Sequence, residues 1–431
     1  MKIPEILLVE SQHRPGSLAK VLGAIGDCGL VVEHLNAVRR DQDKTVWEIT
    51  LEVEPGQIEE VRARIDVLPN ARVLGVSDRV FNRHLGGKIR MISRASISSP
   101  QELRDIYTPG VARVCLAIRD RPELAWEYTS LPYTVAIVTN GTAILGLGDI
   151  GPLAGLPVME GKAALLAKFA DLSGVPILIE ERRPEALVEI VCAIAPSFGA
   201  IQLEDIRAPE CFAVEDLLRA RLDKPVLHDD QHGTAVVTLA ALLAASRMRG
   251  RDLRGAVVGQ IGLGAAGIGI VRLLRRYGVE RVLGTDVNER QLAMLETLGG
   301  RRATLAELMA SADIVIATTG RPGLIAPDMV RPGQMVFALS NPEPEIEPRL
   351  ALERGAAFAA DGRGINNVLG FPGLFRGALE ARARCFTDAM LFAAAETIAR
   401  LAPAGELVPD PLDRAVHDEV AKAVRAAATA R

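Results

Sequence analysis

Apolar and polar positions along the first 76 residues follow the pattern of a small α+β domain. Short apolar runs typical of strands alternate with two stretches of helical periodicity, in the order strand, helix, strand, strand, helix, strand. These elements are predicted at residues 6–9, 17–28, 31–38, 45–53, 58–65 and 71–76. Ser17 is expected to cap the first helix, and residues 41–43 are expected to form the turn between the second and third strands.

The remaining pattern predicts an α/β catalytic region followed by a Rossmann-type, doubly wound region. Between residues 101 and 224, helical segments alternate with apolar strands such as 133–138 and 175–179. From residue 225 strands and helices alternate regularly, which is typical of a parallel sheet with helices on both faces. The tail, residues 380–431, is Ala-rich and predicted to be helical. We therefore expect three domains, at residues 1–76, 77–224 and 225–431.

Composition narrows the class of protein. The net charge of −4 and the lack of a basic block argue against nucleic-acid binding. The most apolar stretch, residues 235–245, is shorter than the roughly 20 residues that cross a bilayer, and charges interrupt any signal-peptide core. The 5 scattered cysteines form no C-x-x-C pair, which favours neither a zinc site nor disulfides. We expect a cytoplasmic protein without nucleic-acid or membrane partners.

A glycine-rich turn indicates a dinucleotide site. The apolar run 256–261 leads into Gly262-Leu263-Gly264-Ala265-Ala266-Gly267 and then into a helical pattern, the required context for G-x-G-x-x-G. The first glycine permits a tight turn, the second lets a pyrophosphate approach the backbone, and the third lets helix and strand pack closely. Asp286 ends the next predicted strand, where an acid bonds the ribose hydroxyls and repels a 2′-phosphate. NAD is therefore expected before NADP, although Arg290 lies near enough to weaken that preference.

Two groups of carboxylates follow apolar segments. They lie in Leu203-Glu204-Asp205-Ile206 and in His228-Asp229-Asp230-Gln231-His232-Gly233. Grouped carboxylates repel one another unless protons or a cation neutralise them, and oxygen ligands suit Mg²⁺ or Mn²⁺. Spacing alone leaves two alternatives open. The aspartates of the second segment cap the helix that follows, or its two histidines, four residues apart, bind zinc.

Together these segments resemble the malic enzyme family. Five further stretches match motifs of that family, in the family's order. They are Tyr107-Thr108-Pro109-Gly110-Val111-Ala112, Ile144-Leu145-Gly146-Leu147-Gly148-Asp149-Ile150-Gly151, Pro157-Val158-Met159-Glu160-Gly161-Lys162, Ser340-Asn341-Pro342-Glu343-Pro344-Glu345-Ile346 and Asn366-Asn367-Val368-Leu369-Gly370-Phe371-Pro372-Gly373. The resemblance runs from about Gly87 to Leu401 and is to the shorter bacterial type.

The resemblance assigns roles to single residues of these motifs. It implies that Tyr107 is the general acid and that Lys162 is the general base and contacts the substrate. It implies that three carboxylates bind Mg²⁺ or Mn²⁺: Glu204, Asp205 and Asp230. Asp229 is implied to lie behind these ligands without binding the metal directly. It implies that asparagines lie near the nicotinamide and the substrate: Asn341 at the former, Asn366 or Asn367 at the latter.

The reaction implied by the resemblance is the oxidative decarboxylation of malate to pyruvate and CO₂ with reduction of NAD(P). Lys162 must be neutral to take the hydroxyl proton, so its pKa is expected to be lowered by burial or by nearby positive charge. Two alternatives are kept: a malolactic or oxaloacetate-decarboxylating enzyme with the same site, and an effector-binding regulatory protein with an inactive enzyme domain. Larger relatives carry an arginine where Thr142-Ala143 stand here, so the group that holds the distal malate carboxylate is unassigned.

The first 76 residues resemble an ACT domain, because Arg14-Pro15-Gly16-Ser17-Leu18 follows the first strand of a β-α-β-β-α-β pattern. That resemblance implies a small-molecule effector bound at an interface. We expect a homodimer or a larger even oligomer, since the sheet leaves strand edges that need cover. The alternative is a ferredoxin-like module that serves only packing or dimerisation.

Overall fold

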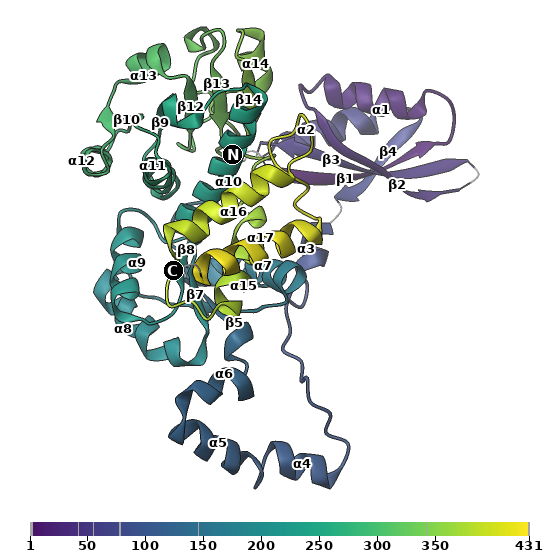
Figure 1. Ribbon diagram of the computed structural model, residues 1–431. Coiled ribbons are helices and arrows are strands. Elements are labelled where there is room, and N and C mark those ends of the chain that lie inside the picture. Colours follow the sequence, from purple (N-terminus) through teal and green to yellow (C-terminus); the bar gives the residue numbers. More distant parts are fainter. Residues whose placement is uncertain are drawn as a thin grey trace. The chain divides into compact units, whose positions relative to one another are not determined.

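The computed structural model describes residues 3–41, 43–54, 56–76, 79–144, 146–341 and 343–429. The chain forms two compact units, Met1–Lys88 and Ile89–Arg431, whose elements are labelled in Figure 1. Several residues of the predicted segments lie outside the described residues: Gln42 of the turn, Ser77 and Asp78, Leu145 and Pro342.

The first unit is a four-stranded antiparallel sheet with two helices packed on it. Its elements are β1 (Ile3–Gln12), α1 (Ser17–Gly26), β2 (Val32–Arg40), β3 (Lys44–Val53), α2 (Gln57–Asp66) and β4 (Ala71–Val76), and the strand order is β2-β3-β1-β4. The predicted order of elements is confirmed. The predicted cap is wrong, because Gly16 stands before the helix with a φ of 79° and Ser17 is its first residue. An ACT identity stays a prediction.

The second unit contains two parallel sheets. The first has the order β6-β5-β7-β8, built from β5 (Thr134–Thr139), β6 (Ser173–Leu178), β7 (Ala200–Leu203) and β8 (Val226–His228). The helices between these strands are α7 (Pro152–Ala170), α8 (Pro184–Ile194) and α9 (Glu210–Arg221). Every residue of β5 is buried, as expected for a strand inside a parallel sheet that helices cover.

The second sheet has the order β11-β10-β9-β12-β13-β14 and is parallel throughout. Its strands are β9 (Val257–Ile261), β10 (Arg281–Thr285), β11 (Arg301–Arg302), β12 (Ile314–Ala317), β13 (Met335–Ala338) and β14 (Phe358–Asp361). Its helices are α11 (Ala265–Tyr277), α12 (Glu289–Thr297), α13 (Leu305–Ser311) and α14 (Pro348–Glu353). This order is that of the dinucleotide-binding doubly wound fold, and the prediction is confirmed.

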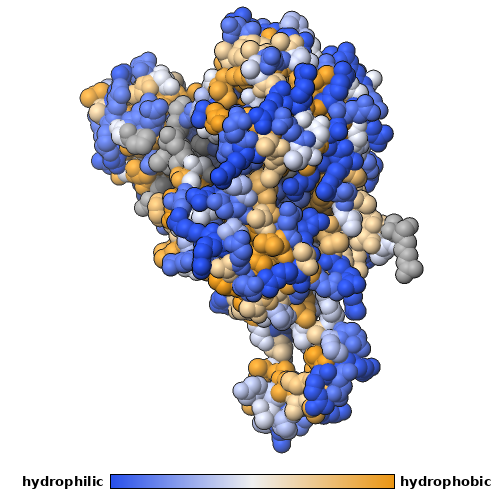
Figure 2. Space-filling view, turned by 90° about the vertical axis from the view of Figure 1, so that its left-hand side faces the viewer, coloured by the Kyte–Doolittle hydropathy of each residue, from blue (hydrophilic) through white to orange (hydrophobic). Residues whose placement is uncertain are grey.

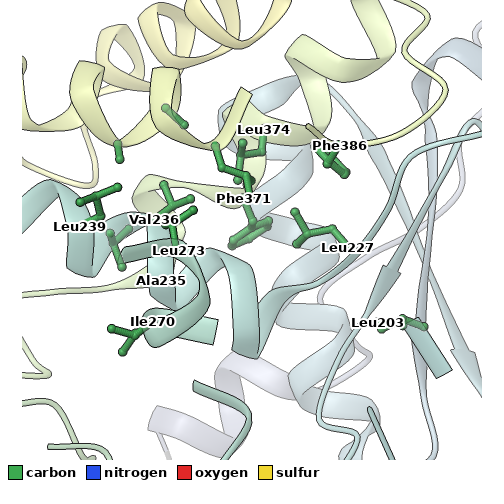
Figure 3. Close-up of a cluster of buried hydrophobic side chains, with 14 of the residues drawn as sticks. Leu203, Leu227, Ala235, Val236, Leu239, Ile270, Leu273, Phe371, Leu374 and Phe386 are labelled. Atoms are coloured by element: carbon green, nitrogen blue, oxygen red, sulfur yellow. The ribbon is translucent and has the colours of Figure 1, made fainter. Parts of the chain in front are cut away.

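One long helix, α10 (Asp229–Met248), lies in the core of the second unit and packs against α11 and α16 (Asp388–Leu401). Figure 3 shows Val236 and Leu239 of α10 in one apolar cluster with Leu273 of α11. The same cluster includes Phe371 of α15 (Phe371–Glu380), which contacts α7 as α17 (Arg414–Thr429) does. The C-terminal helices thus pack beside the first parallel sheet, and β8 pairs with β7 of that sheet.

Residues 89–130, which we call the arm, precede the first parallel sheet. The arm contains three short helices, α4 (Pro100–Ile106), α5 (Val111–Asp120) and α6 (Ala125–Tyr128). The helix before them in the sequence, α3 (Arg79–His84), belongs to the first unit. In the part of the chain that is described, no helix has both the length and the apolar character needed to cross a membrane.

Candidate active site

Carboxylates gather at the carboxyl ends of two neighbouring strands. Glu204 and Asp205 follow β7, and Asp229 and Asp230 open α10 directly after β8. Oxygens of Glu204, Asp205 and Asp230 lie within 4.8 Å of one another. The backbone fixes this spacing, because Asp205 takes a left-handed φ of 53° and its N–H donates to Asp230 Oδ2 at 2.9 Å. Three carboxylate oxygens at this spacing are a donor set that suits Mg²⁺ or Mn²⁺.

Lys162, on α7, is held inside this cluster with only 11% of its side chain exposed. Its Nζ lies 2.5 Å from Asp229 Oδ2, 2.9 Å from Glu204 Oε1 and 4.7 Å from the centre of the Phe371 ring. Burial lowers the pKa of Lys162, but the charges of Asp229 and Glu204 raise it further, so the pKa stands above its ordinary value. The expectation of a lowered pKa is wrong here, because the neighbouring carboxylates outweigh burial.

Negative charge is in excess within the cluster. Burial raises the pKa of Glu204 well above its usual range, although Lys162 opposes the shift, and burial also raises the pKa of Asp229. One ammonium therefore faces more carboxylate charge than it neutralises. Gln202 Nε2 donates to Glu204 Oε2 at 2.7 Å and adds only a neutral partner. A divalent cation would relieve this repulsion, so the residues present fit a metal.

The two asparagines expected near the substrate, Asn366 and Asn367, make different hydrogen bonds. Asn367 donates through Nδ2 to Asp229 Oδ2 at 2.7 Å, which brings it into the cluster. Asn366 accepts the N–H of Val368 at 2.9 Å and caps a short 3-10 turn. Gly233 completes the setting of Asp229, because a Cβ there would lie 1.9 Å from Asp229 Oδ1.

A buried glutamate behind the cluster was missed by the sequence reasoning. Glu215, on α9, accepts the backbone N–H of His228 at 3.0 Å, Nε2 of Gln231 at 3.2 Å and a hydrogen bond from His232 at 2.9 Å. Burial opposes its ionisation, but His232 lowers the pKa of Glu215 further, to about 2. The sequence did offer a signal for Glu215, because this acidic residue lies on the same buried face of α9 as Cys211 and Leu218.

Both alternatives for the histidine–aspartate segment differ from the structure. The helix begins at Asp229 itself and has no side-chain cap, so neither aspartate is a capping residue; both instead lie in its first turn. Acidic side chains there are favoured by the helix dipole. His232 is already engaged by Glu215, and among the described residues the carboxylate trio is the only group with metal-ligand spacing.

A second site lies where the strand order of the doubly wound sheet reverses. A cavity of about 370 Å³ opens at the carboxyl ends of β9, β10 and β12. Gly262 has a φ of 84°, and a Cβ on Gly267 would lie 2.0 Å from Gly262 O. A Cβ on Gly264 would meet nothing within 4 Å, which leaves room for a ligand beside the backbone. These are the three properties expected of a dinucleotide-binding turn.

The acid at the end of β10 lines this cavity. Asp286 Oδ2 accepts the N–H of Leu263 at 2.6 Å, so the carboxylate is fixed beside the glycine turn. Ala265 and Ala266 begin α11. Other lining residues were not predicted from the sequence: Thr285, Val287, Leu305, Thr318, Thr319, Arg321 and Leu324. Among the described lining residues the cation is Arg321, not Arg290.

Asn341 follows β13, two strands from the glycine turn, and its side chain is exposed. The preceding residue is held firmly, because Ser340 Oγ donates to the buried Glu345 at 2.6 Å. Glu345 also accepts the Thr319 N–H at 2.6 Å and so ties this loop to the cavity wall. Proximity of Asn341 to a nicotinamide stays a prediction.

Tyr107 is not brought to the cluster within this chain. It follows α4 on the arm and its side chain is 69% exposed. Figure 1 shows α4 and α5 well away from α7, which carries Lys162. The predicted base and the predicted acid therefore lie apart in one copy of the chain.

Comparisons with known proteins show the family to which the chain belongs. Residues 87–219 match the family model for the malic enzyme N-terminal domain, and residues 231–300 match that for the malic enzyme NAD binding domain. NAD-dependent malic enzyme 1 of Bacillus subtilis is 52% identical over 98% of this chain and 97% of that protein. NAD-dependent malic enzyme of Geobacillus stearothermophilus is 39% identical over 96% of this chain and 91% of that protein. The crystal structure of malic enzyme from Pyrococcus horikoshii is 42% identical, covers 79% of this chain and 87% of that chain, and has a TM-score of 0.76. The chain therefore belongs to the malic enzyme family.

Proposed function

We propose that this protein is an NAD-dependent malic enzyme, which oxidises and decarboxylates malate to pyruvate and CO₂. The observation that carries the proposal is the position of Lys162, buried between Asp229 and Glu204 beside a trio of carboxylates. To remove the hydroxyl proton of a hydroxy acid that chelates a metal, an enzyme needs a base beside the metal ligands, and Lys162 lies in that position. The cofactor cavity in the same unit and the NAD-dependent relatives support the redox half of the reaction.

Glu204, Asp205 and Asp230 would hold Mg²⁺ or Mn²⁺. A divalent cation there supplies positive charge that polarises the oxygen on C2 of the substrate. Lys162 then takes the hydroxyl proton. Because Asp229 and Glu204 hold the pKa of Lys162 high, its amine is protonated while their charges are uncompensated. A cation that neutralised part of that carboxylate charge would lower the pKa, so that Lys162 could release its proton to solvent and then take the hydroxyl proton as a neutral amine. Asp229 and Asn367 fix the direction in which Lys162 points.

Tyr107 would return a proton to C3 of enolpyruvate after CO₂ has left. The glycine turn would hold NAD, which would supply the hydride acceptor for C2, and Asp286 would bond the adenosine ribose. A 2′-phosphate would lie against the Asp286 carboxylate, which favours NAD over NADP. The positive charge of Arg321 in the same cavity wall would attract a 2′-phosphate and so offset part of the repulsion from Asp286. We therefore expect a preference for NAD without complete exclusion of NADP.

We propose regulatory and assembly roles for the first unit as well. Its β-α-β-β-α-β order and antiparallel sheet are those expected of an ACT-like domain at residues 1–76, ahead of a catalytic region at 77–224 and an NAD-binding region at 225–431. Such a unit would bind a small effector between copies of a homodimer or larger even oligomer. A truncation that starts near Arg79 should lose the response to that effector, and one that keeps every response would end the regulatory proposal.

One assay set tests the reaction. Purified protein is given malate with NAD or NADP, or oxaloacetate without cofactor, each with and without Mn²⁺, and NADH or NADPH, pyruvate and lactate are measured. The proposal expects NADH and pyruvate in equal amounts, dependent on Mn²⁺. Lactate without net NADH would identify a malolactic enzyme, decarboxylation of oxaloacetate alone would identify a decarboxylase, and no turnover of either acid would leave a regulatory protein.

A further inference from the structure

A further cavity, of about 440 Å³, lies in the second unit and shares no lining residue with the carboxylate trio or the cofactor cavity. Its wall includes residues just before two strands of the first parallel sheet, since Tyr133 precedes β5 and Leu172 precedes β6. The carboxylate trio follows β7 and β8, at the opposite, carboxyl edge of that sheet. α6 of the arm adds Trp126 to the wall, and α15 and the residues after it add Arg376 and Arg382.

Two helix ends at this cavity have a strained backbone. Asp171 follows α7 with a φ of 55°, and Arg382 lies two residues beyond α15 with a φ of 50°. Glycine is the usual residue in this left-handed conformation after a helix, because a Cβ is unfavourable there. Asp205 of the carboxylate trio is the other non-glycine residue with a positive φ among those described. Such outliers gather at functional sites, so the cavity shares a backbone feature with the metal-type site.

Three of the four ions that line the cavity are paired. Asp171 pairs with Arg414, and Glu380 pairs with Arg376 at 2.8 Å. The fourth ion is Arg382. Among the described residues no carboxylate forms an ion pair with its guanidinium, which lies over an aromatic ring instead. The cavity therefore has one positive charge without a counterion, and the anionic group of a ligand would supply it.

Aromatic rings are the second chemical feature of the wall. The Arg382 guanidinium lies 5.8 Å from the centre of the half-buried Trp126 ring, and Tyr133 is 48% exposed. Apolar side chains complete the lining: Pro132, Ala170, Leu172 and Leu379. Aromatic side chains stack with planar rings, and cavities of about 300–1,000 Å³ commonly hold small organic ligands. The lining therefore suits a planar ring that carries one anionic group.

We propose that this cavity binds a small aromatic carboxylate, with the carboxylate at Arg382 and the ring against Trp126 and Tyr133. A monoanion fits because only one lining cation lacks a counterion. The carboxylates of Asp171 and Glu380 in the same wall would repel a second negative charge, which disfavours dicarboxylates such as malate and also polyphosphates. The proposal does not rest on the proposed reaction, because it concerns the opposite edge of the sheet.

Tryptophan fluorescence tests the site directly. The chain has 2 tryptophans, so in a full-length Trp47→Phe protein the remaining reporter is Trp126. Benzoate is the probe. It should change this fluorescence saturably, with half-saturation at about 1 mM or below, as expected for a ligand of its size. A Trp126→Phe protein, in which Trp47 of the first unit is the reporter, is the control and should show no saturable change.

Substitution of the cation separates recognition from adsorption. Figure 2 shows hydrophobic patches on the narrow lower projection that the arm forms, and such patches attract an apolar ring whatever its charge. In the Trp47→Phe protein, Arg382→Gln should weaken benzoate binding by at least about tenfold, whereas Arg382→Lys should weaken it less. Arg384→Gln makes the same change on an 80% exposed arginine that is paired with Asp223, and this matched control should leave benzoate binding unchanged.

Two analogues of benzoate test the ligand class. Benzyl alcohol keeps the ring without the charge, and cyclohexanecarboxylate keeps the charge without a planar ring; each should bind at least about threefold more weakly than benzoate. Isothermal titration calorimetry of the unsubstituted protein and of its Arg382→Gln variant repeats the measurement without the tryptophan reporter. Absence of saturable benzoate binding in both assays, equal binding by Arg382→Gln, or equal binding of either analogue would overturn the proposal.

Discussion

Asp229 Oδ2 accepts two hydrogen bonds at once, from Lys162 Nζ at 2.5 Å and from Asn367 Nδ2 at 2.7 Å. One buried oxygen thereby joins three segments that are far apart in the sequence: the lysine motif, the start of α10 and the double-asparagine motif. The other oxygen, Oδ1, occupies the space beside Gly233, where a Cβ would lie only 1.9 Å from it. The direction of the lysine in this site is therefore set by Asp229.

The first prediction concerns the metal. Glu204→Gln and Asp230→Asn each remove a charged donor from the trio, so the Mn²⁺ concentration for half-maximal activity should rise by more than about tenfold. Glu189→Gln is the matched control, because it makes the same chemical change on an exposed ion pair with Arg221. Titration of activity with Mn²⁺ measures the effect. Equal metal requirements in wild type and both site variants would remove the metal assignment.

The second prediction separates the acid from the base. Lys162→Ala and Tyr107→Phe should each lower the rate of malate oxidation by about 10²–10⁴-fold, the usual contribution of a general acid or base. Tyr107→Phe should slow the protonation of enolpyruvate more than it slows hydride transfer. Tyr128→Phe, another exposed tyrosine of the arm, is the control and should keep wild-type rates. Losses below about threefold in both site variants would contradict the roles.

The third prediction concerns the cofactor. Asp286→Ser removes the carboxylate beside the ribose site, so the ratio of kcat/KM for NAD to that for NADP should fall. Arg321→Ala in the same cavity should act in the opposite direction, because it removes the cation available to a 2′-phosphate. Steady-state kinetics with both cofactors check the two variants. A wild type that prefers NADP would refute the reading of Asp286.

Short sequence patterns predicted the glycine turn of the cofactor site and the carboxylates of the metal site. The glycine turn could be read because three glycines, a preceding apolar run and a following helical period all lie within a short stretch of sequence. Glu204 and Asp230 could be assigned to one site because each follows an apolar segment and because the resemblance to the malic enzyme family implies that both bind the metal.

What depends on packing between distant segments could not be read in this way. Arg321 enters the cofactor cavity from the loop after β12, and nothing in its neighbours in sequence distinguishes it from other surface arginines. The pKa of Lys162 was predicted in the wrong direction because its sign depends on how many carboxylates surround the amine. The choice of Asn367 over Asn366 as the partner of Asp229 depends on the 3-10 turn that Asn366 caps.

The fourth prediction concerns stability and pH. His417, on α17, is fully buried; it lies 4.4 Å from Phe169, ring centre to ring centre, and donates from Nε2 to Pro411 O at 2.9 Å. Burial lowers the pKa of His417, since a second proton on Nδ1 would find no acceptor. Below about pH 6.5 the His417 side chain takes up a proton in the unfolded chain but not in the folded chain. The stabilisation that the neutral, buried His417 contributes is therefore complete above that pH and is lost as the pH falls toward the folded pKa.

Two variants check the role of this imidazole. His417→Gln keeps a donor for Pro411 and His417→Phe keeps the stacking, but neither side chain titrates. Both should lose less unfolding free energy than the wild type between about pH 8 and about pH 5.5, measured by urea denaturation. A pH dependence equal to that of the wild type in both variants would contradict the assignment to His417.

The last prediction concerns Glu215, which supports the metal segment without touching the carboxylate trio. Its two oxygens accept from the His228 backbone, Gln231 and His232, and the side chain is 1% exposed. Glu215→Gln turns one of these acceptors into a donor that faces other donors, so the free energy of unfolding should fall by about 1–3 kcal/mol. The metal requirement should rise as well, because the backbone of His228 sets where Asp230 lies.

Urea unfolding and Mn²⁺ titration of the same preparation separate these two effects for Glu215. The exposed Glu189→Gln, which should change neither quantity, is again the matched control. A Glu215→Gln protein as stable as the wild type would show that the buried charge contributes nothing to the fold. Lower stability with an unchanged Mn²⁺ requirement would confine Glu215 to a structural role and leave the placing of Asp230 to the Asp205 backbone, which donates to it at 2.9 Å.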